Sequence, residues 1–161
     1  MSLNRFYKAF LVLLAIGFGV NYWVKHNKVP DLPFFQTKLV DEKGNEVSAS
    51  DWKNKYVLVS YFQSWCGDCA KELPSLQMLQ DKLAKDKISI VLISDEPFSK
   101  INSFKNHFKS NLPFFQSVDP FKELGIRVFP TTYLIDPNGK LLLSKLEGYD
   151  WSSSEVLQLI K

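Results

Sequence analysis

Cys66 and Cys69 are the only two cysteines in the 161-residue chain, and two residues separate them. They come after Tyr56–Gln63, an apolar run rich in valine and aromatic residues that predicts a buried strand. They open a segment to about Lys85 whose apolar residues recur at helical spacing. Two sulfurs so placed at the start of a helix can form a disulfide with little backbone movement. The sequence therefore predicts a redox-active cysteine pair at a strand-to-helix junction.

The two cysteines are expected to differ in reactivity. The sulfur of Cys66 would lie near the unpaired N–H groups of the first helical turn, which stabilise a thiolate and lower the pKa of the thiol below its ordinary value of about 8.5. Cys66 is therefore the predicted nucleophile, and Cys69 would resolve the mixed disulfide. The alternatives are a pair of packed core cysteines or half of a zinc site. A zinc site would lack a second pair of ligands, because His26 falls in an expected linker and His107 is alone on an expected helix.

The remaining elements must position this pair. Hairpin signals at Lys43–Asn45 and Pro137–Gly139 each join two short strand patterns. The expected strands are Gln36–Val40, Glu46–Ser48, Tyr56–Gln63, Ile88–Ser94, Thr131–Ile135 and Lys140–Ser144. The expected helices are Cys66 to about Lys85, Ser99–Lys109 with Ser99 as N-cap, a short turn at Pro120–Leu124, and Ser152–Ile160. This order predicts a three-layer α/β sandwich.

The N-terminal segment has a different composition. Ala9–Val20 contains no polar side chain, and the run continues past Asn21 to Val24. Residues 6–24 are just long enough to span a bilayer as a helix, with Tyr22 and Trp23 at one boundary. We expect an uncleaved membrane anchor at residues 1–24, a linker at 25–33 and one domain at 34–161.

Two other interpretations of this segment remain open. A cleaved signal peptide would have to use a small-residue site around Ala15, Gly17 and Gly19, which leaves a short apolar core. A buried core helix is disfavoured because the segment is terminal and apolar on every face. Basic residues flank both ends, so the positive-inside bias is slight, and an exported C-terminal domain is the expectation.

Composition excludes several classes of protein. A net charge of +3, from 20 basic and 17 acidic residues, is too small to indicate a nucleic-acid partner. Two cysteines are too few for a disulfide-scaffolded secreted module. A hydrophobic content of 45% and a charged content of 23% are those of a folded globular chain.

Two ordered motifs carry a resemblance to a known family. Residues 65–74 read WCGDCAKELP, a WCxxCxxExP pattern, and residues 129–136 read FPTTYLID, followed by Gly139. In these motifs the chain resembles the thioredoxin superfamily, and within it the membrane-anchored TlpA/ResA-like thiol–disulfide oxidoreductases. The resemblance implies a thioredoxin-like three-layer α/β/α sandwich with an N-terminal β-hairpin extension, preceded by one transmembrane helix. It implies no cofactor and no metal.

The resemblance also implies a substrate site around the cysteines. Pro130 would be a cis proline beside the disulfide, and the backbone of Phe129 would pair with the incoming chain. Trp65, Gly67 and Asp68 would line the same site. The family often has proline where this chain has Asp68, and a carboxylate there would oppose the helix effect on the nucleophilic thiol. The redox potential is therefore left open.

Glu72 is a candidate for proton transfer. It lies three residues after Cys69, so the two share a helix face, and a partly buried carboxylate there could exchange a proton with that cysteine. Ordinary thioredoxins carry an acidic residue six positions before the nucleophile, where this chain has Ser60. The resemblance implies that Glu72 substitutes for it. The alternative is a solvated helix glutamate.

The predicted function is reduction of disulfides in exported proteins, with apocytochrome c as one candidate client. An upstream thiol donor would reset the pair, and the domain would lie outside the inner membrane of a bacterial cell envelope. A thiol oxidase or isomerase of the same fold is the first alternative. A peroxiredoxin-type peroxidase is disfavoured because Gln63 and Val59 occupy the positions where it needs a hydroxyl residue and a proline. A Sco-like copper-delivery protein would need a CxxxC spacing, and a non-catalytic binding domain would not need the intact pair.

Overall fold

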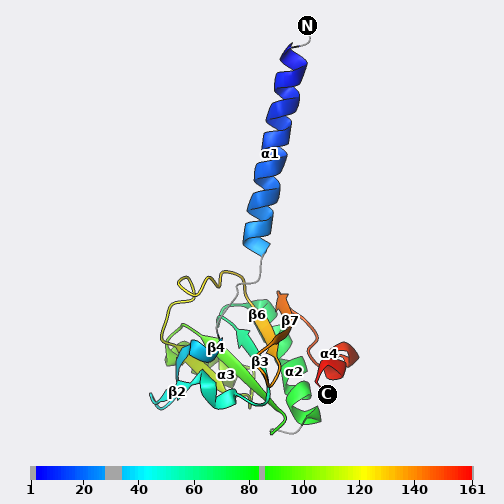
Figure 1. Cartoon of the computed structure of the whole chain (residues 1–161). Helices are drawn as coiled ribbons and strands as arrows, with labels where there is room; N and C mark the ends of the chain where they lie inside the picture. The colour runs from blue at the N-terminus through cyan, green and yellow to red at the C-terminus, as the bar shows by residue number, and fades with distance from the viewer. Residues whose placement is uncertain (1–2, 28–33, 84–85, 161) are drawn as a thin grey trace.

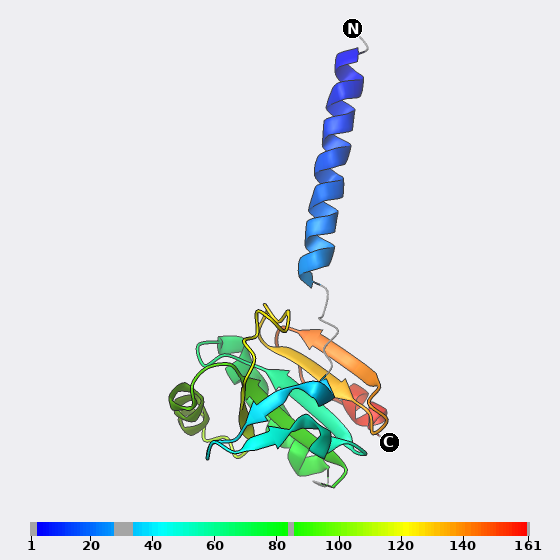
Figure 2. The ribbon, with the colours of Figure 1, turned by 60° about the vertical axis from the view of Figure 1, so that its left-hand side comes forward.

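The chain consists of an N-terminal helix and an α/β domain (Figure 1). The computed structural model describes residues 3–27, 34–83 and 86–160. Helix α1 (Leu3–Asn27) extends away from the domain in Figures 1 and 2, and its apolar side chains between Tyr7 and Val20 are exposed. Within the described residues, no helix has the length and apolarity needed to cross a membrane. Residues 25–27 of the expected linker continue α1, and 28–33 lie outside the described residues.

A mixed sheet of seven strands forms the centre of the described domain, in the order β2-β1-β5-β4-β3-β6-β7. β3 pairs in parallel with β4 and antiparallel with β6. The strands are β1 (Lys38–Val40), β2 (Glu46–Ser48), β3 (Tyr56–Tyr61), β4 (Ile88–Ser94), β5 (Phe114–Ser117), β6 (Thr131–Ile135) and β7 (Leu141–Leu146). All six expected strands are present, with shifts of a few residues. β5 has no counterpart among the expected strands.

The helices of the domain are α2 (Gly67–Lys82), α3 (Phe98–His107) and α4 (Ser154–Leu159), with 3-10 helices η1 (Phe34–Gln36) and η2 (Ala49–Trp52). The expected N-cap of α3 is wrong. The N-cap is Pro97 rather than Ser99, and its carbonyl accepts the Lys100 N–H at 2.9 Å. Proline suits a helix start because the N–H that it lacks would have no helical partner there.

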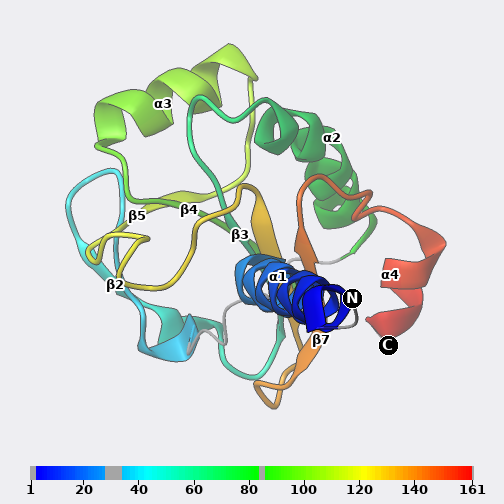
Figure 3. The ribbon, with the colours of Figure 1, turned by 90° about the horizontal axis from the view of Figure 1, so that it is seen from above.

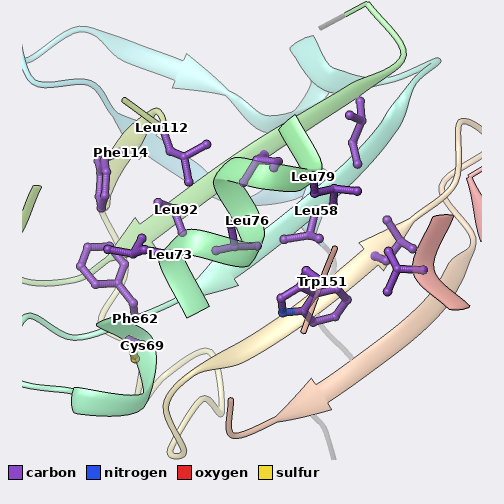
Figure 4. Close-up of a cluster of buried hydrophobic side chains, with 14 of the residues drawn as sticks. Leu58, Phe62, Cys69, Leu73, Leu76, Leu79, Leu92, Leu112, Phe114 and Trp151 are labelled. Carbon is purple, nitrogen blue, oxygen red and sulfur yellow. The ribbon is translucent and has the colours of Figure 1, made fainter. Parts of the chain in front are cut away.

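Residues of β3 and β4 alternate between two hydrophobic clusters on opposite faces of the sheet. One face carries Leu58 and Leu92 and is covered by α2, α3 and α4. Figure 3 shows these three helices around the sheet, and Figure 4 shows Leu58 and Leu92 next to Leu76 of α2. The other carries Val59 and Tyr61. It packs against residues from η1, η2 and the segment before β6: Phe34, Ala49, Trp52, Phe121 and Ile126. The expected second helical layer is therefore wrong for the described domain, because 3-10 helices and a loop cover that face.

The pairing of the strands brings distant segments of the chain together at one end of the central strands. Tyr61 at the end of β3 pairs with Thr131 at the start of β6 and with Ile93 near the end of β4. Three connections therefore leave the sheet side by side: residues 62–66 into α2, residues 95–97 into α3, and residues 128–130 into β6. The cysteine pair lies at this junction.

Candidate active site

Cys66 and Cys69 form a disulfide at the N-terminus of α2, with their Cα atoms 5.3 Å apart. Cys66 is the N-cap of the helix, and the backbone N–H of Cys69 donates to its sulfur at 3.1 Å. Cys66 is 7% exposed and Cys69 is 3% exposed, so the first sulfur is the more accessible. A backbone donor directed at the Cys66 sulfur stabilises the thiolate that reduction would leave there. The geometry supports Cys66 as the attacking thiol.

An aromatic wall stands beside the disulfide. Trp65 is 71% exposed, and its ring stands edge-to-face with the Phe129 ring, with the two ring centroids 5.9 Å apart. The Phe129–Pro130 peptide bond is cis, as the motif predicts. The Phe129 ring in turn packs against the ring of the buried Phe121, with their centroids 5.7 Å apart, and this contact holds the Phe129 ring in place. A large apolar surface is thus open to solvent next to the reacting sulfurs.

Gly67 and Asp68 lie between the cysteines and are both exposed. A Cβ atom added at Gly67 would meet nothing within 4 Å, so close packing around this position does not require glycine. Asp68 forms an ion pair with Lys71, whose Nζ is 2.7 Å from the carboxylate. This pairing offsets part of the negative charge that would otherwise oppose thiolate formation at Cys66.

Glu72 is buried, with 2% of its surface exposed, so the solvated alternative is wrong. Its Oε1 accepts hydrogen bonds from Trp151 Nε1 at 2.9 Å and from the Tyr149 N–H at 3.0 Å. Thr132 Oγ1 lies 3.4 Å from Oε2 and 2.9 Å from Ser60 Oγ. The carboxyl group therefore joins α2 to β6, to β3 and to the segment before α4.

Burial raises the pKa of Glu72 to about 7, and the hydrogen bonds from Trp151, Tyr149 and Thr132 only partly oppose that rise. Glu72 also lines an open cleft of about 600 Å³ between α2 and residues 147–150. A buried acid that titrates near neutral pH beside a solvent-filled cleft can exchange protons with water.

Sequence reasoning missed the residues that hold these groups. Trp151 and the backbone of Tyr149 fix Glu72, although they lie in an unremarkable stretch before α4. Asp95 and Glu96 hold the loop before Cys66. The sequence does contain one signal for this acidic pair. The two residues directly follow the predicted buried strand Ile88–Ser94, which was expected to lie beside the strand that leads to Cys66.

The comparisons with known proteins agree with this site. A sequence model of the AhpC/TSA family matches residues 27–144. The thiol–disulfide oxidoreductase ResA of Oceanobacillus iheyensis is 29% identical over 168 residues, covering 91% of this chain and 88% of that one. ResA of Bacillus thuringiensis subsp. konkukian is 28% identical over 156 residues, with 88% of each chain covered.

Solved structures show the same fold. The thioredoxin domain of a thiol–disulfide oxidoreductase from Bacteroides vulgatus has a TM-score of 0.68 and 28% identity, covering 77% of this chain and 92% of that one. The solution structure of a thiol:disulfide interchange protein from Bacteroides sp. has a TM-score of 0.67 and 28% identity, covering 77% and 85%. The expected thioredoxin-like α/β fold is confirmed.

Proposed function

The chain belongs to the AhpC/TSA family and is a thiol–disulfide oxidoreductase, and we propose that it reduces disulfides of exported proteins. The observation that carries the proposal is the geometry of Cys66, whose sulfur receives a backbone N–H at the start of α2 beside the exposed Trp65 ring. Such a site offers a reactive thiolate together with an apolar surface against which a peptide can lie.

The reaction proceeds by two thiol–disulfide exchanges. The reduced Cys66 thiolate attacks one sulfur of a substrate disulfide, forming a mixed disulfide and releasing the other substrate sulfur as a thiolate. The Cys69 thiolate then attacks the Cys66 sulfur, which releases the second substrate thiolate and closes the Cys66–Cys69 disulfide. The substrate gains two electrons, and an upstream dithiol donor supplies two electrons to restore the pair.

Glu72 serves the second exchange in this proposal. Cys69 must lose its proton before it can attack, and it is buried one helical turn from Glu72. With its pKa at about 7, the Glu72 carboxylate can accept that proton near neutral pH and pass it to the cleft.

The site geometry also disfavours a peroxidase and leaves a thiol oxidase or isomerase as the alternative to a reductase. Gln63 occupies the position where a peroxidase of the peroxiredoxin type needs a hydroxyl residue, and its amide donates to Asp95 at 2.6 Å. Oxidation of substrate dithiols would use the same two sulfurs in the reverse direction, and a measurement of the redox potential of the pair would distinguish it from reduction. Isomerisation would begin with the same attack by Cys66 but release the substrate with no net transfer of electrons, so a count of substrate thiols before and after the reaction distinguishes it.

Trapping tests the proposal directly. In cells carrying the Cys69→Ser variant, the second exchange cannot occur, so substrates should accumulate as mixed disulfides on Cys66. Non-reducing electrophoresis of alkylated extracts, followed by identification of the trapped proteins, measures this. The Cys66→Ser/Cys69→Ser double variant is the control and should trap none.

The identity of the trapped proteins separates the narrower proposals. Exported proteins with structural disulfides support general reduction, and apocytochrome c among them supports a role in cytochrome maturation. If Cys69→Ser traps no more than the double variant does, the reductase proposal is wrong.

We further propose that α1 holds the domain at the inner membrane of a bacterial cell envelope, on the extracytoplasmic side. The support is the exposure of its apolar side chains: Phe10, Leu13, Leu14, Ile16 and Phe18 are all more than half exposed. Lipid would cover this surface.

Vesicle flotation tests the anchor. The full chain should float with phospholipid vesicles at high salt, whereas a variant lacking residues 1–27 should stay at the bottom of the gradient. High salt excludes simple charge attraction. Equal distribution of the two proteins would contradict the proposal.

A further inference from the structure

We propose that Asp95 and Glu96, the two residues after β4, are positioning residues. They fix the loop before Cys66 relative to the segment that carries Phe129. The inference rests on the proposed thiol–disulfide exchange at Cys66. It concerns residues that are outside both sequence motifs and do not touch the reacting sulfurs.

Glu96 holds the loop that leads into Cys66. It is 8% exposed, and its Oε2 accepts the backbone N–H of Ser64 at 2.6 Å, while its Oε1 accepts the Ser64 hydroxyl at 3.0 Å. Lys100 Nζ approaches the same carboxylate at 3.2 Å, so its charge is paired. Ser64 precedes Trp65 and Cys66 directly, and the Cys66 N–H is fixed on Gln63 O at 3.0 Å. Glu96 thus anchors the backbone just before the nucleophile.

Asp95 joins that loop to the opposite wall. Its Oδ1 accepts from Gln63 Nε2 at 2.6 Å, and its Oδ2 accepts the backbone N–H of Phe121 at 2.8 Å. The Phe121 ring supports Phe129, the residue before cis Pro130. One carboxylate therefore spans the loop that carries Trp65 and the segment that carries Phe129.

These contacts serve the site rather than the sheet. The backbone pairing of β4 ends at Ser94, and the two acids lie beyond it. Losing them leaves the sheet paired and frees residues 63–65 and the Phe121 region to move apart. Small displacements of reacting groups cost large factors in rate, because the attacking sulfur must reach its target along one line.

Glu96→Ala tests the first half, with Glu96→Gln as the matched conservative variant. The glutamine oxygen can still accept the Ser64 N–H, and its amide nitrogen can donate to the Ser64 hydroxyl. We expect Glu96→Ala to lower the rate of alkylation of reduced Cys66 at pH 7 by about 10-fold, and Glu96→Gln to keep at least half of the original rate.

This pair of variants separates positioning from charge. Both remove a negative charge near Cys66, and that loss alone would favour the thiolate and speed alkylation. If the alanine and glutamine variants behave alike, or if neither changes the rate, the inference is overturned. Ser64→Ala removes only the hydroxyl contact and should give a smaller slowing, so it replaces Glu96→Ala if that variant fails to fold.

Asp95→Ala against Asp95→Asn tests the second half. The asparagine oxygen can hold the Phe121 N–H, and the Gln63 amide can turn to accept from the new nitrogen. We expect Asp95→Ala to raise the KM for a peptide disulfide about 10-fold more than it lowers kcat, and Asp95→Asn to restore KM.

Ile88→Val is the stability control, because it removes a buried methyl group at the start of β4, the end of that strand away from Asp95. Site defects of the same size in Ile88→Val would overturn the inference. An unmodified chain without exchange activity would instead refute the proposed function, while alkylation of Cys66 would still report on the positioning role.

Discussion

Replacing Cys66 by alanine should lower the rate of disulfide exchange by about 1000-fold or more, the scale seen when a covalent nucleophile is removed. The remaining thiol, Cys69, is 3% exposed and lies inside the first turn of α2, so a disulfide substrate should react with it far more slowly than with Cys66. The fold should persist, since the sheet pairing does not involve this sulfur and Cys66 is only one of many residues in the cluster that α2 covers.

The measurement is the rate at which the reduced protein releases thiolate from a small aromatic disulfide, followed by absorbance. Cys69→Ala is the matched variant. It should retain a fast first exchange and stop at the mixed disulfide, because the attacking sulfur is intact. A fast reaction in the Cys66 variant with a slow one in the Cys69 variant would reverse the roles assigned to the two cysteines.

Glu72→Gln should remove a pH-dependent loss of stability. Burial sets the pKa of Glu72 at about 7 in the folded protein, against an ordinary value of 4.5. Between these pH values the folded state keeps a proton that the unfolded state has released, so the free energy of unfolding falls as pH rises. The fall is complete above pH 7, absent below pH 4.5, and amounts to about 3 kcal/mol.

Glutamine cannot ionise and can still satisfy the neighbouring donors. Its oxygen can accept from Trp151 Nε1 and the Tyr149 N–H, and its nitrogen can face Thr132 Oγ1. Urea unfolding should therefore find Glu72→Gln more stable than the original chain at pH 8 and close to it at pH 4.5. The exposed Glu123→Gln is the control and should show no such pH-dependent difference.

The same variant should slow resolution of the mixed disulfide by about 100-fold at neutral pH, the scale of a lost proton-transfer group. The inflection near pH 7 in the rate of resolution should disappear as well. Trp151→Phe sharpens the assignment, because removing a hydrogen bond that lowers the pKa of Glu72 should move the inflection to higher pH. An unchanged inflection in Glu72→Gln would assign it to another group.

Local pattern predicts most of the strands because their signals lie within the strands themselves. β2, β4 and β6 have the bounds that their apolar runs and turn residues indicate. β5 has no counterpart among the expected strands because Phe114–Ser117 is too short to show alternation. The three-residue β2 could be predicted because a hairpin turn joins it to β1, and no such turn marks β5. Helical periodicity identified α2 and α3 but could not say which face of the sheet each covers, and both lie on the same one.

The same distinction holds at the site. The cysteines and Glu72 could be found because their spacing on one helix is a local fact. The partners of Glu72 could not, since Thr132 and Trp151 lie 60 and 79 residues away and meet it only through the sheet. The place of Glu96 just after a buried strand is visible in the sequence, but its hydrogen bond to Ser64 depends on which strands are neighbours and cannot be predicted from a local pattern.

The wide sequence separation of these partners has a consequence for biosynthesis. The chain is made from its N-terminus, so both cysteines leave the ribosome long before β6 and Trp151 have been synthesised. Until residues 121–132 and 149–151 are in place, the pair lacks its aromatic wall and Glu72 lacks its donors. A nascent or truncated chain can therefore form the start of α2 but not the complete site, which arises only when segments far apart in the sequence have folded together. The contact with Phe129 and the hydrogen bonds that hold Glu72 become available only at that stage.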